Sequence, residues 1–153
     1  MQANTRYSDQ VAVLASIDPA SVAPSTVVSA WVSVANYHRV AAYLKTGAMT
    51  ATSTINASLQ QATNSSGAGA KAINFTSGSP CQIAQLLAAS NSDEQVILEC
   101  KVDDLDANNG YCYVALSVTV AAAASILSAD VLGVNPRFGP ASAGNNASVV
   151  QVV

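Results

Sequence analysis

Oxygen-bearing side chains in the most acidic part of the chain have a spacing that could bind a cation. Asp104, Asp106 and Asn108 occupy alternate positions, as the oxygen ligands of a calcium-binding loop do. The match ends there, because Asn109 stands where that loop needs glycine and Ala115 where it needs a bidentate glutamate. The sequence therefore favours a solvated turn whose Asp and Asn side chains bond their own backbone, with weak calcium binding as the alternative.

Other residues that commonly carry out chemistry are few. His38 is the only histidine, which excludes a histidine-based metal cluster, and no nucleophile-elbow motif completes a serine-histidine-aspartate triad with it. Residues 67–72 resemble a phosphate-binding loop but lack the GxxxxGKS/T spacing, and Ala72 stands where the hydroxyl should be. We therefore expect no enzymatic activity, no catalytic residue, no cofactor and no bound metal.

The three cysteines, Cys81, Cys100 and Cys112, have no CxxC spacing. Cys100 and Cys112 lie on the apolar sides of alternating stretches, where a buried thiol acts as a small hydrophobic group. We expect three free thiols, as in a chain folded in a reducing cytoplasm. A cross-link between Cys100 and Cys112 is the alternative.

Two stretches with strict alternation of apolar and polar residues, 95–103 and 111–121, flank the acidic segment. A period of two places successive side chains on opposite faces of a strand, so each stretch predicts a half-buried strand. Ile97 is an exception, an apolar residue on the polar side. The run between them ends in Gly110, which can adopt the positive φ that hairpin loops need. We predict an antiparallel hairpin against a core, with Cys100 opposite Val114.

Similar alternation predicts strands along the rest of the chain. Residues 81–90 fit either a short helix or a strand, and residues 121–124 either prolong the preceding strand or cross between sheets. About eight strands near ten residues apart predict an all-β fold, a β-sandwich or jelly roll. The further predicted strands lie within residues 26–35, 39–45, 51–60, 71–76, 128–134 and 148–153.

Both ends are expected to lie outside the sandwich domain, which we place at residues 26–135. Residues 1–25 contain two prolines that bias the preceding residues toward extended conformations, and they predict an extended N-terminal arm. Residues 136–153 form a C-terminal extension that ends in an apolar strand. A free strand edge of this kind invites pairing with another chain, and we expect the arm to pair with a neighbouring subunit. Candidate interface residues are Val11, Val13, Leu14, Trp31, Val149, Val150 and Val152.

The composition limits the classes of partner. Half of the chain is hydrophobic and only 10% is charged, against roughly 25% in an ordinary soluble domain. So little charge favours a protein whose faces are covered by copies of itself or by a partner. The net charge of −3 and scattered basic residues argue against nucleic acid. No apolar run is long enough to span a membrane, and residues 1–6 do not resemble a signal peptide.

Several stretches, in their order along the chain, are shared with a known class of proteins. They are residues 35–44 (ANYHRVAAYL), 46–49 (TGAM), 59–63 (LQQAT), 67–73 (GAGAKAI), 99–106 (ECKVDDLD), 110–114 (GYCYV) and 136–140 (PRFGP). Together they resemble small virion proteins of tailed bacteriophages, encoded near the major capsid protein and found as head decoration (cement) proteins or related structural subunits. The similarity covers roughly residues 27–140 and leaves out both ends.

The resemblance implies a structural protein of the virion, assembled in the cytoplasm of a bacterial host, with no catalytic residues. Its implied partners are the phage major capsid protein and further copies of itself, with a trimer favoured, and neither nucleic acid nor a membrane. Each copy would bridge capsid subunits and stabilise the shell. A tail or head-tail joining subunit is one alternative, and a carbohydrate-binding β-sandwich is another, because jelly rolls also serve as lectins.

Overall fold

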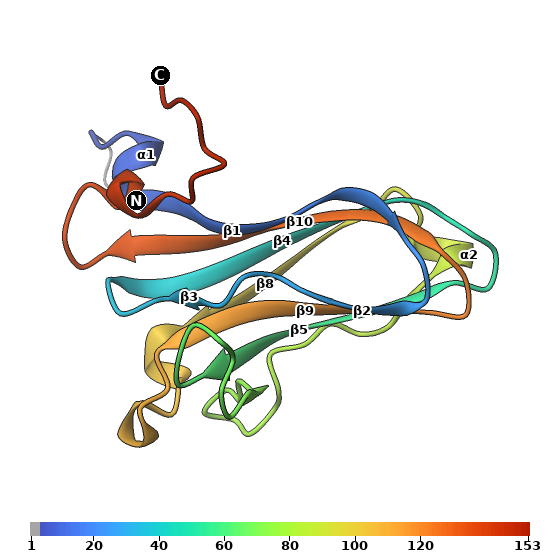
Figure 1. The fold of residues 1–153 in the computed structure, drawn as a ribbon, viewed down its shortest axis with the longest axis horizontal. Helices are drawn as coiled ribbons and strands as arrows, with labels where there is room; N and C mark the ends of the chain where they lie inside the picture. The colour runs from blue at the N-terminus through green and yellow to red at the C-terminus, as the bar shows by residue number, and fades with distance from the viewer. Residues whose placement is uncertain (1–3) are drawn as a thin grey trace.

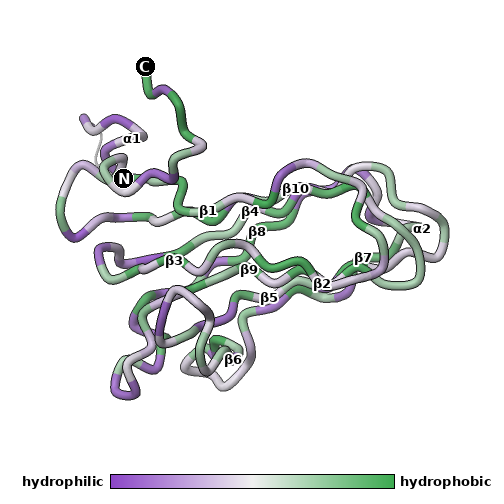
Figure 2. Tube along the Cα trace, viewed as in Figure 1, coloured by the Kyte–Doolittle hydropathy of each residue, from purple (hydrophilic) through white to green (hydrophobic). Residues whose placement is uncertain are grey.

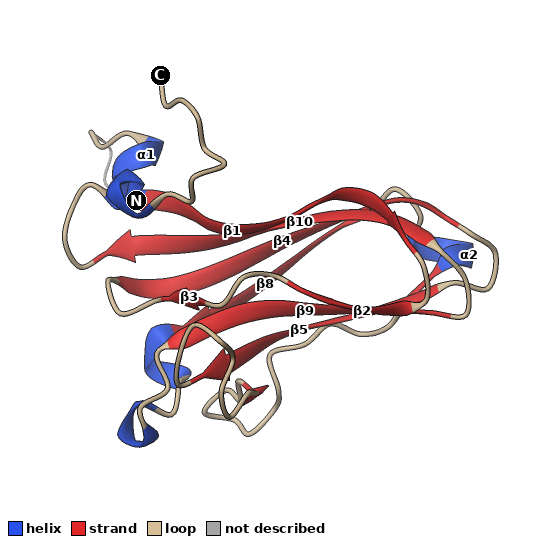
Figure 3. Ribbon diagram, viewed as in Figure 1, coloured by secondary structure: helices blue, strands red, loops and turns tan. Residues whose placement is uncertain are grey.

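The computed structural model describes residues 4–153, and it consists of two antiparallel β-sheets packed face to face (Figures 1 and 3). Sheet A has the strand order β1-β10-β4-β8, and sheet B has the order β2-β9-β5-β6, with β3 also paired to β9 and β7 to β5. No helix within residues 4–153 is long and apolar enough to cross a membrane. The strands are β1 (Val11–Val22), β2 (Ser25–Val28), β3 (Val32–Ser33), β4 (Tyr37–Met49), β5 (Thr54–Ala62), β6 (Lys71–Ala72), β7 (Leu86–Leu87), β8 (Gln95–Lys101), β9 (Tyr113–Ala121) and β10 (Ser125–Pro136). The helices are α1 (Tyr7–Gln10) and α2 (Ala88–Asn91), with 3-10 turns η1 (Val102–Asp104), η2 (Ala107–Asn109) and η3 (Ala141–Gly144).

The strand order is that of a jelly roll. Neighbouring strands come from opposite ends of the chain: β1 pairs with β10, β2 with β9, and β4 with β8, all antiparallel. Two sheets wound in this way form the double Greek key that defines the fold. The prediction of an all-β sandwich or jelly roll is therefore confirmed.

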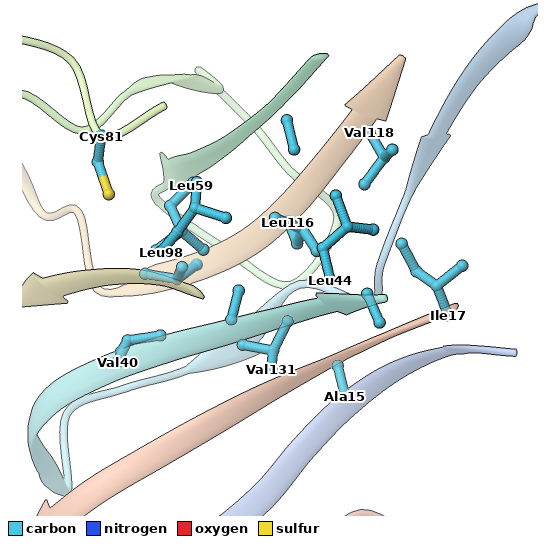
Figure 4. Packing of buried hydrophobic residues seen from close by; sticks show 14 of the residues in the cluster. Ala15, Ile17, Val40, Leu44, Leu59, Cys81, Leu98, Leu116, Val118 and Val131 are labelled. Atoms are coloured by element: carbon cyan, nitrogen blue, oxygen red, sulfur yellow. The ribbon is translucent and has the colours of Figure 1, made fainter. Parts of the chain in front are cut away.

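The core lies between the sheets and is built from the apolar positions of the alternating stretches. Leu44 of β4, Leu59 of β5 and Leu116 of β9 are fully buried, and Figure 4 shows them directed into the space between the sheets. In Figure 2 the apolar residues follow the strands, while the loops at the ends of the sandwich are more polar. The period of two arises because one face of each strand contacts this core.

Residues 95–103 and 111–121 form strands, as predicted, but they do not form a hairpin. β8 pairs with β4 in sheet A, where Cys100 lies opposite Val40 and not opposite Val114. β9 pairs with β2 and β5 in sheet B. The acidic segment between them, with η1 and η2, crosses from one sheet to the other. Both strands bury their apolar sides in the same core from opposite layers, so alternation alone could not identify their partners.

The N-terminal segment corrects the prediction of an arm over residues 1–25. β1 pairs with β10 of the same chain from Val11 to Val22, and Leu14 is buried in the core between the sheets. Pro19 lies at a break in the pairing register, on an edge strand where a missing N–H is tolerated. Residues 1–3 of the predicted arm lie outside the described residues.

The C-terminal extension also differs from its prediction. Beyond η3 the chain returns to the outer edge of β1: the Val13 amide donates to Asn145 Oδ1 (2.9 Å), and the Asn146 amide donates to the Val13 carbonyl (2.6 Å). Residues 148–153 form no strand, so the predicted terminal strand is wrong. We call residues 147–153 the C-terminal tail, and Figure 1 shows it projecting away from the sandwich beyond β1 and α1.

The other predicted strands are found with altered limits. Residues 26–35 are divided into β2 and β3, because Ser29 turns inward and exchanges hydrogen bonds with Leu116 of β9 (2.9 and 3.0 Å). Residues 81–90 contain both the short strand β7 and helix α2, and residues 122–124 cross between the sheets. Strands β4, β5, β6 and β10 include parts or all of the predicted stretches 39–45, 51–60, 71–76 and 128–134.

Candidate functional site

The acidic segment forms a compact turn whose carboxylates accept hydrogen bonds from their own chain. Asp106 accepts from Lys71 Nζ (2.5 Å), and both its oxygens accept from Asn109 Nδ2 (2.9 and 2.8 Å). Asp104 accepts from the Lys101 amide (3.1 Å). Within residues 4–153, no group of three or more His, Cys, Asp and Glu side chains is placed to hold a metal ion. These contacts favour the turn interpretation over the calcium site.

Lys71 connects this turn to the glycine-rich loop at residues 64–70. Its ammonium lies 4.1 Å from the centre of the Tyr111 ring, and the Tyr111 hydroxyl donates to the Gly69 carbonyl (2.9 Å). Gly67 has φ +78°, and a Cβ there would lie 2.5 Å from Trp31 Nε1. The glycines therefore allow close packing under two aromatic rings, and the loop is structural rather than phosphate-binding.

The charges of Lys71 and Asp106 are mutually stabilised. Hydrogen bonds from Lys71 and then Asn109 lower the pKa of the Asp106 carboxyl, and the hydrogen bond to Asp106 raises the pKa of Lys71. A lowered carboxyl pKa stabilises the fold above the unfolded pKa, and this contribution is lost as pH falls through the folded pKa. The raised lysine pKa stabilises the fold below its unfolded pKa, and this contribution is lost as pH rises through the folded value.

Replacing Lys71 with Met should raise the pKa of Asp106 toward the ordinary aspartate value of about 3.9, because the principal donor to its carboxylate is removed. The measurement is a carboxyl-carbon NMR titration of the wild type and the variant. Lys45→Met, on sheet A, is the matched control and should leave the titration of Asp106 unchanged. An unchanged Asp106 pKa in Lys71→Met would show that the ion pair does not form in solution.

The cysteines and the histidine lie apart from this turn. All three thiols are free; Cys81 and Cys100 are buried, and Cys112 is half-buried. Cys81 Sγ lies 3.7 Å from the Glu99 carbonyl, beside Cys100, and a hydrogen bond between the two thiols together with burial raises the pKa of Cys100. His38 is exposed on β4.

The predicted interface residues do not lie on one surface. Leu14 packs in the core, so the fold does not leave it free for a partner. Trp31 is half-buried against the Gly67 loop of its own chain. Val150 is 96% exposed in the C-terminal tail, which also contains Val149 and Val152. Val11 and Val13 lie on the outer face of sheet A.

The outer face of sheet A carries an apolar surface that we call the outer patch. Val11, Ala41 and Leu132 form a small buried cluster, separate from the core, against which Val13, Tyr43 and Val134 pack. Ile97, the apolar exception in its alternating stretch, is 56% exposed. Apart from Val13, these residues line a depression of about 260 Å³, together with Tyr7 and Glu99. Ile97 is a sequence signal of this surface, because its position on the polar side of β8 places it on the outer face, where the predicted interface residues Val11 and Val13 also lie.

Charged residues lie around the outer patch, and one of them, Glu99, also lines its depression. Arg39 Nη1 lies 2.7 Å from Glu99 Oε1 in an exposed ion pair at one side. Lys45 and Asp130 line an adjoining depression, together with Tyr7, Val13, Tyr43 and Leu132. An apolar centre with a charged rim is the usual organisation of a protein interface.

Comparison with known proteins adds a similarity of fold. No protein-family model matches the sequence, and no curated protein is similar to it. The structure is similar to a solved structure of Desmodium yellow mottle tymovirus, with 11% sequence identity over 90% of this chain and 94% of that chain and a TM-score of 0.38. This similarity concerns the fold alone, and it identifies no tailed-bacteriophage family.

Proposed function

We propose that this chain is a non-enzymatic structural protein of a virion, and more specifically a capsid decoration (cement) protein of a tailed bacteriophage. The observation that carries the proposal is the outer patch on sheet A. The apolar C-terminal tail projects from the same side of the molecule (Figure 1). The resemblance of residues 27–140 to small phage virion proteins supports the phage assignment. Jelly rolls occur in viral capsid proteins, but the fold alone does not decide a function.

Two surfaces are available for assembly in this proposal. The outer patch would contact a second copy or the major capsid protein, and the tail, with Val150 and Val153 almost fully exposed, would lie across a neighbour. Only 10% of the residues are charged, so few charges are present to keep these exposed apolar surfaces soluble. Their coverage by a neighbouring subunit would remove the apolar area from water. A homo-oligomer, with a trimer favoured, would then bind the outside of the shell.

The mechanism would be mechanical. Each copy bridges neighbouring capsid subunits, so separation of those subunits exposes the apolar surface that the copy had covered. At roughly 25 cal/mol per Å² of apolar surface, modest contacts repeated over a shell sum to a large stabilisation. A tail or head-tail joining subunit would use the same surfaces, and imaging of virions labelled at the C-terminus would distinguish the two locations.

Ile97→Asp should disrupt assembly, because the interface would bury a carboxylate in place of an apolar side chain. We expect analytical ultracentrifugation to show a shift from oligomer to monomer, and binding to phage heads to weaken by at least about tenfold. Ile126→Asp is the matched control: Ile126 is 46% exposed in the same sheet, outside the outer patch, and its replacement should change neither measurement. Equal behaviour of the two variants would contradict the proposed interface.

A further inference from the structure

The outer face of sheet B carries a hollow that is polar and built without charged residues. Strands β2, β9 and β5, which lie next to one another in this sheet, contain no Asp, Glu, Lys, Arg or His at any position. They form the layer opposite β1, β10 and β4 in Figure 1. The outer patch of sheet A, by contrast, is apolar and has charges at its border.

Strand pairing brings short polar side chains to the centre of the hollow. Ser58 of β5 lies opposite Ser117 of β9, and Gln82 pairs with Ser58 from the other side through an isolated bridge. Two backbone hydrogen bonds hold this added segment against β5, from the Leu59 amide to Cys81 (2.9 Å) and from the Ile83 amide to Ala57 (3.0 Å). The three side chains therefore form one row across the sheet.

Longer side chains stand around this row and give the hollow its depth. Asn56, paired with Thr119, lies on one side of the row, and Gln60 lies on the other. The space has a volume of about 250 Å³. Eight residues line the hollow, and all of them are uncharged: Asn56, Ala57, Ser58, Gln60, Gln82, Ile83, Ser117 and Thr119.

The polar groups of the hollow are largely unpaired. Ser117 is only 8% exposed, yet within residues 4–153 its hydroxyl has no hydrogen-bond partner. The side chains of Asn56, Ser58, Gln60 and Gln82 also make no hydrogen bond to the described chain, whereas Thr119 bonds Thr26 (2.8 Å). No fully buried side-chain nitrogen or oxygen within residues 4–153 lacks a hydrogen-bond partner, so these unpaired groups reach solvent, where water or a ligand can bond to them.

We propose that this hollow binds a neutral saccharide unit. Hydroxyl and amide groups both donate and accept hydrogen bonds, as the hydroxyls of a sugar do. The apolar side of a sugar ring would lie against the half-buried Ile83. A charged ligand would lose its hydration without gaining a counter-charge, because the lining has none.

Position and size also favour a sugar over other ligands. Peptides commonly bind at free sheet edges, whereas this hollow lies over β5 and β9, whose backbones are paired on both sides. Nucleobases bind by stacking on aromatic side chains, and none lines the hollow. Its volume is close to the lower end of small-molecule sites, roughly 300 Å³, which suits one ring of a longer glycan. The site adds carbohydrate attachment to the structural role and does not depend on assembly.

The test uses the full-length protein and defined probes. Affinity electrophoresis through dextran, soluble starch, galactomannan and laminarin would detect polysaccharide binding. Saturation-transfer NMR with glucose, galactose, mannose and N-acetylglucosamine would detect binding of single sugars. We expect retardation by at least one neutral polysaccharide, transfer to at least one sugar, and no retardation by heparin.

Variants assign the binding to the hollow. Gln82→Leu and Ser117→Val each remove polar groups from its central row and should weaken binding by about tenfold. Thr54→Val, on β5 but outside the lining, should stay within about twofold of the wild type. Gln82 is exposed, so its variant keeps the test valid if Ser117→Val fails to fold. Absence of binding to every neutral probe, binding to heparin alone, or binding unchanged in Gln82→Leu would overturn the proposal.

Discussion

Deletion of residues 1–22 is expected to abolish cooperative folding. The deleted segment contains β1, which supplies Leu14 and Ile17 to the core and pairs with β10 over its length. Truncating one buried Leu or Ile to Ala typically costs about 2–5 kcal/mol. Domains of this kind are stable by only about 5–15 kcal/mol, so loss of a whole strand should exceed the total. Far-UV circular dichroism with urea titration provides the measurement.

The matched control removes the other end of the chain. Deletion of residues 148–153 takes away the exposed part of the tail, which packs in no sheet, and should leave the unfolding midpoint unchanged. If the chain without residues 1–22 unfolds cooperatively at the wild-type midpoint, β1 is not needed for folding. That result would agree with the extended arm predicted from the sequence and contradict the edge strand. The two truncations thus separate a strand of the fold from an appendage used only in assembly.

The strands could be predicted because alternation depends only on which face of a strand contacts the core. Residues 39–45 and 111–121 show this, and both lie largely within strands. The pairing partners could not be predicted in the same way. β8 and β9 are adjacent in sequence and both amphipathic, and a glycine-containing turn between them is compatible with either a hairpin or a crossing between sheets. The choice depends on β4 and β5, which occupy the neighbouring positions.

The two ends illustrate a second limit. Pro19 indicated extended backbone correctly, since it lies within β1, but an extended segment is equally suited to an arm and to an edge strand. The surfaces show a third limit. A local signal of the outer patch exists in the place of Ile97 in the alternation, whereas the hollow on sheet B combines Ser58, Gln82 and Ser117 only after strand pairing. Local sequence patterns carry no information on that combination.

Tyr37 and Gly133 form a tight junction between β4 and β10. A Cβ on Gly133 would lie 2.7 Å from Cδ1 and Cε1 of the Tyr37 ring, closer than such atoms approach. The ring is 5% exposed, and its hydroxyl donates to the Ala141 carbonyl of η3 (3.3 Å). Gly144 also contacts that hydroxyl closely enough to exclude a side chain. The ring is therefore confined on several sides, and burial raises the pKa of the Tyr37 phenol.

Because the ring cannot move away, Gly133→Ala should destabilise the protein by about 1–3 kcal/mol through overpacking. Tyr37→Ala should cost about 3–5 kcal/mol, as for other large aromatic truncations, while Tyr37→Phe should cost only about 1 kcal/mol because it removes one hydrogen bond. In the Tyr37→Ala background the added methyl has space. There Gly133→Ala should be neutral or stabilising by up to about 1 kcal/mol, since glycine weakens a strand interior.

A double-mutant cycle of urea denaturation curves measures this coupling. The decisive quantity is the difference between the effects of Gly133→Ala in the two backgrounds, which we expect to be at least about 1 kcal/mol. Additive effects would show that the ring does not lie on Gly133 in solution, and the register of β10 against β4 would then need to be reassigned. A coupling of the expected sign ties the jelly-roll pairing of these two central strands to a measurable free energy.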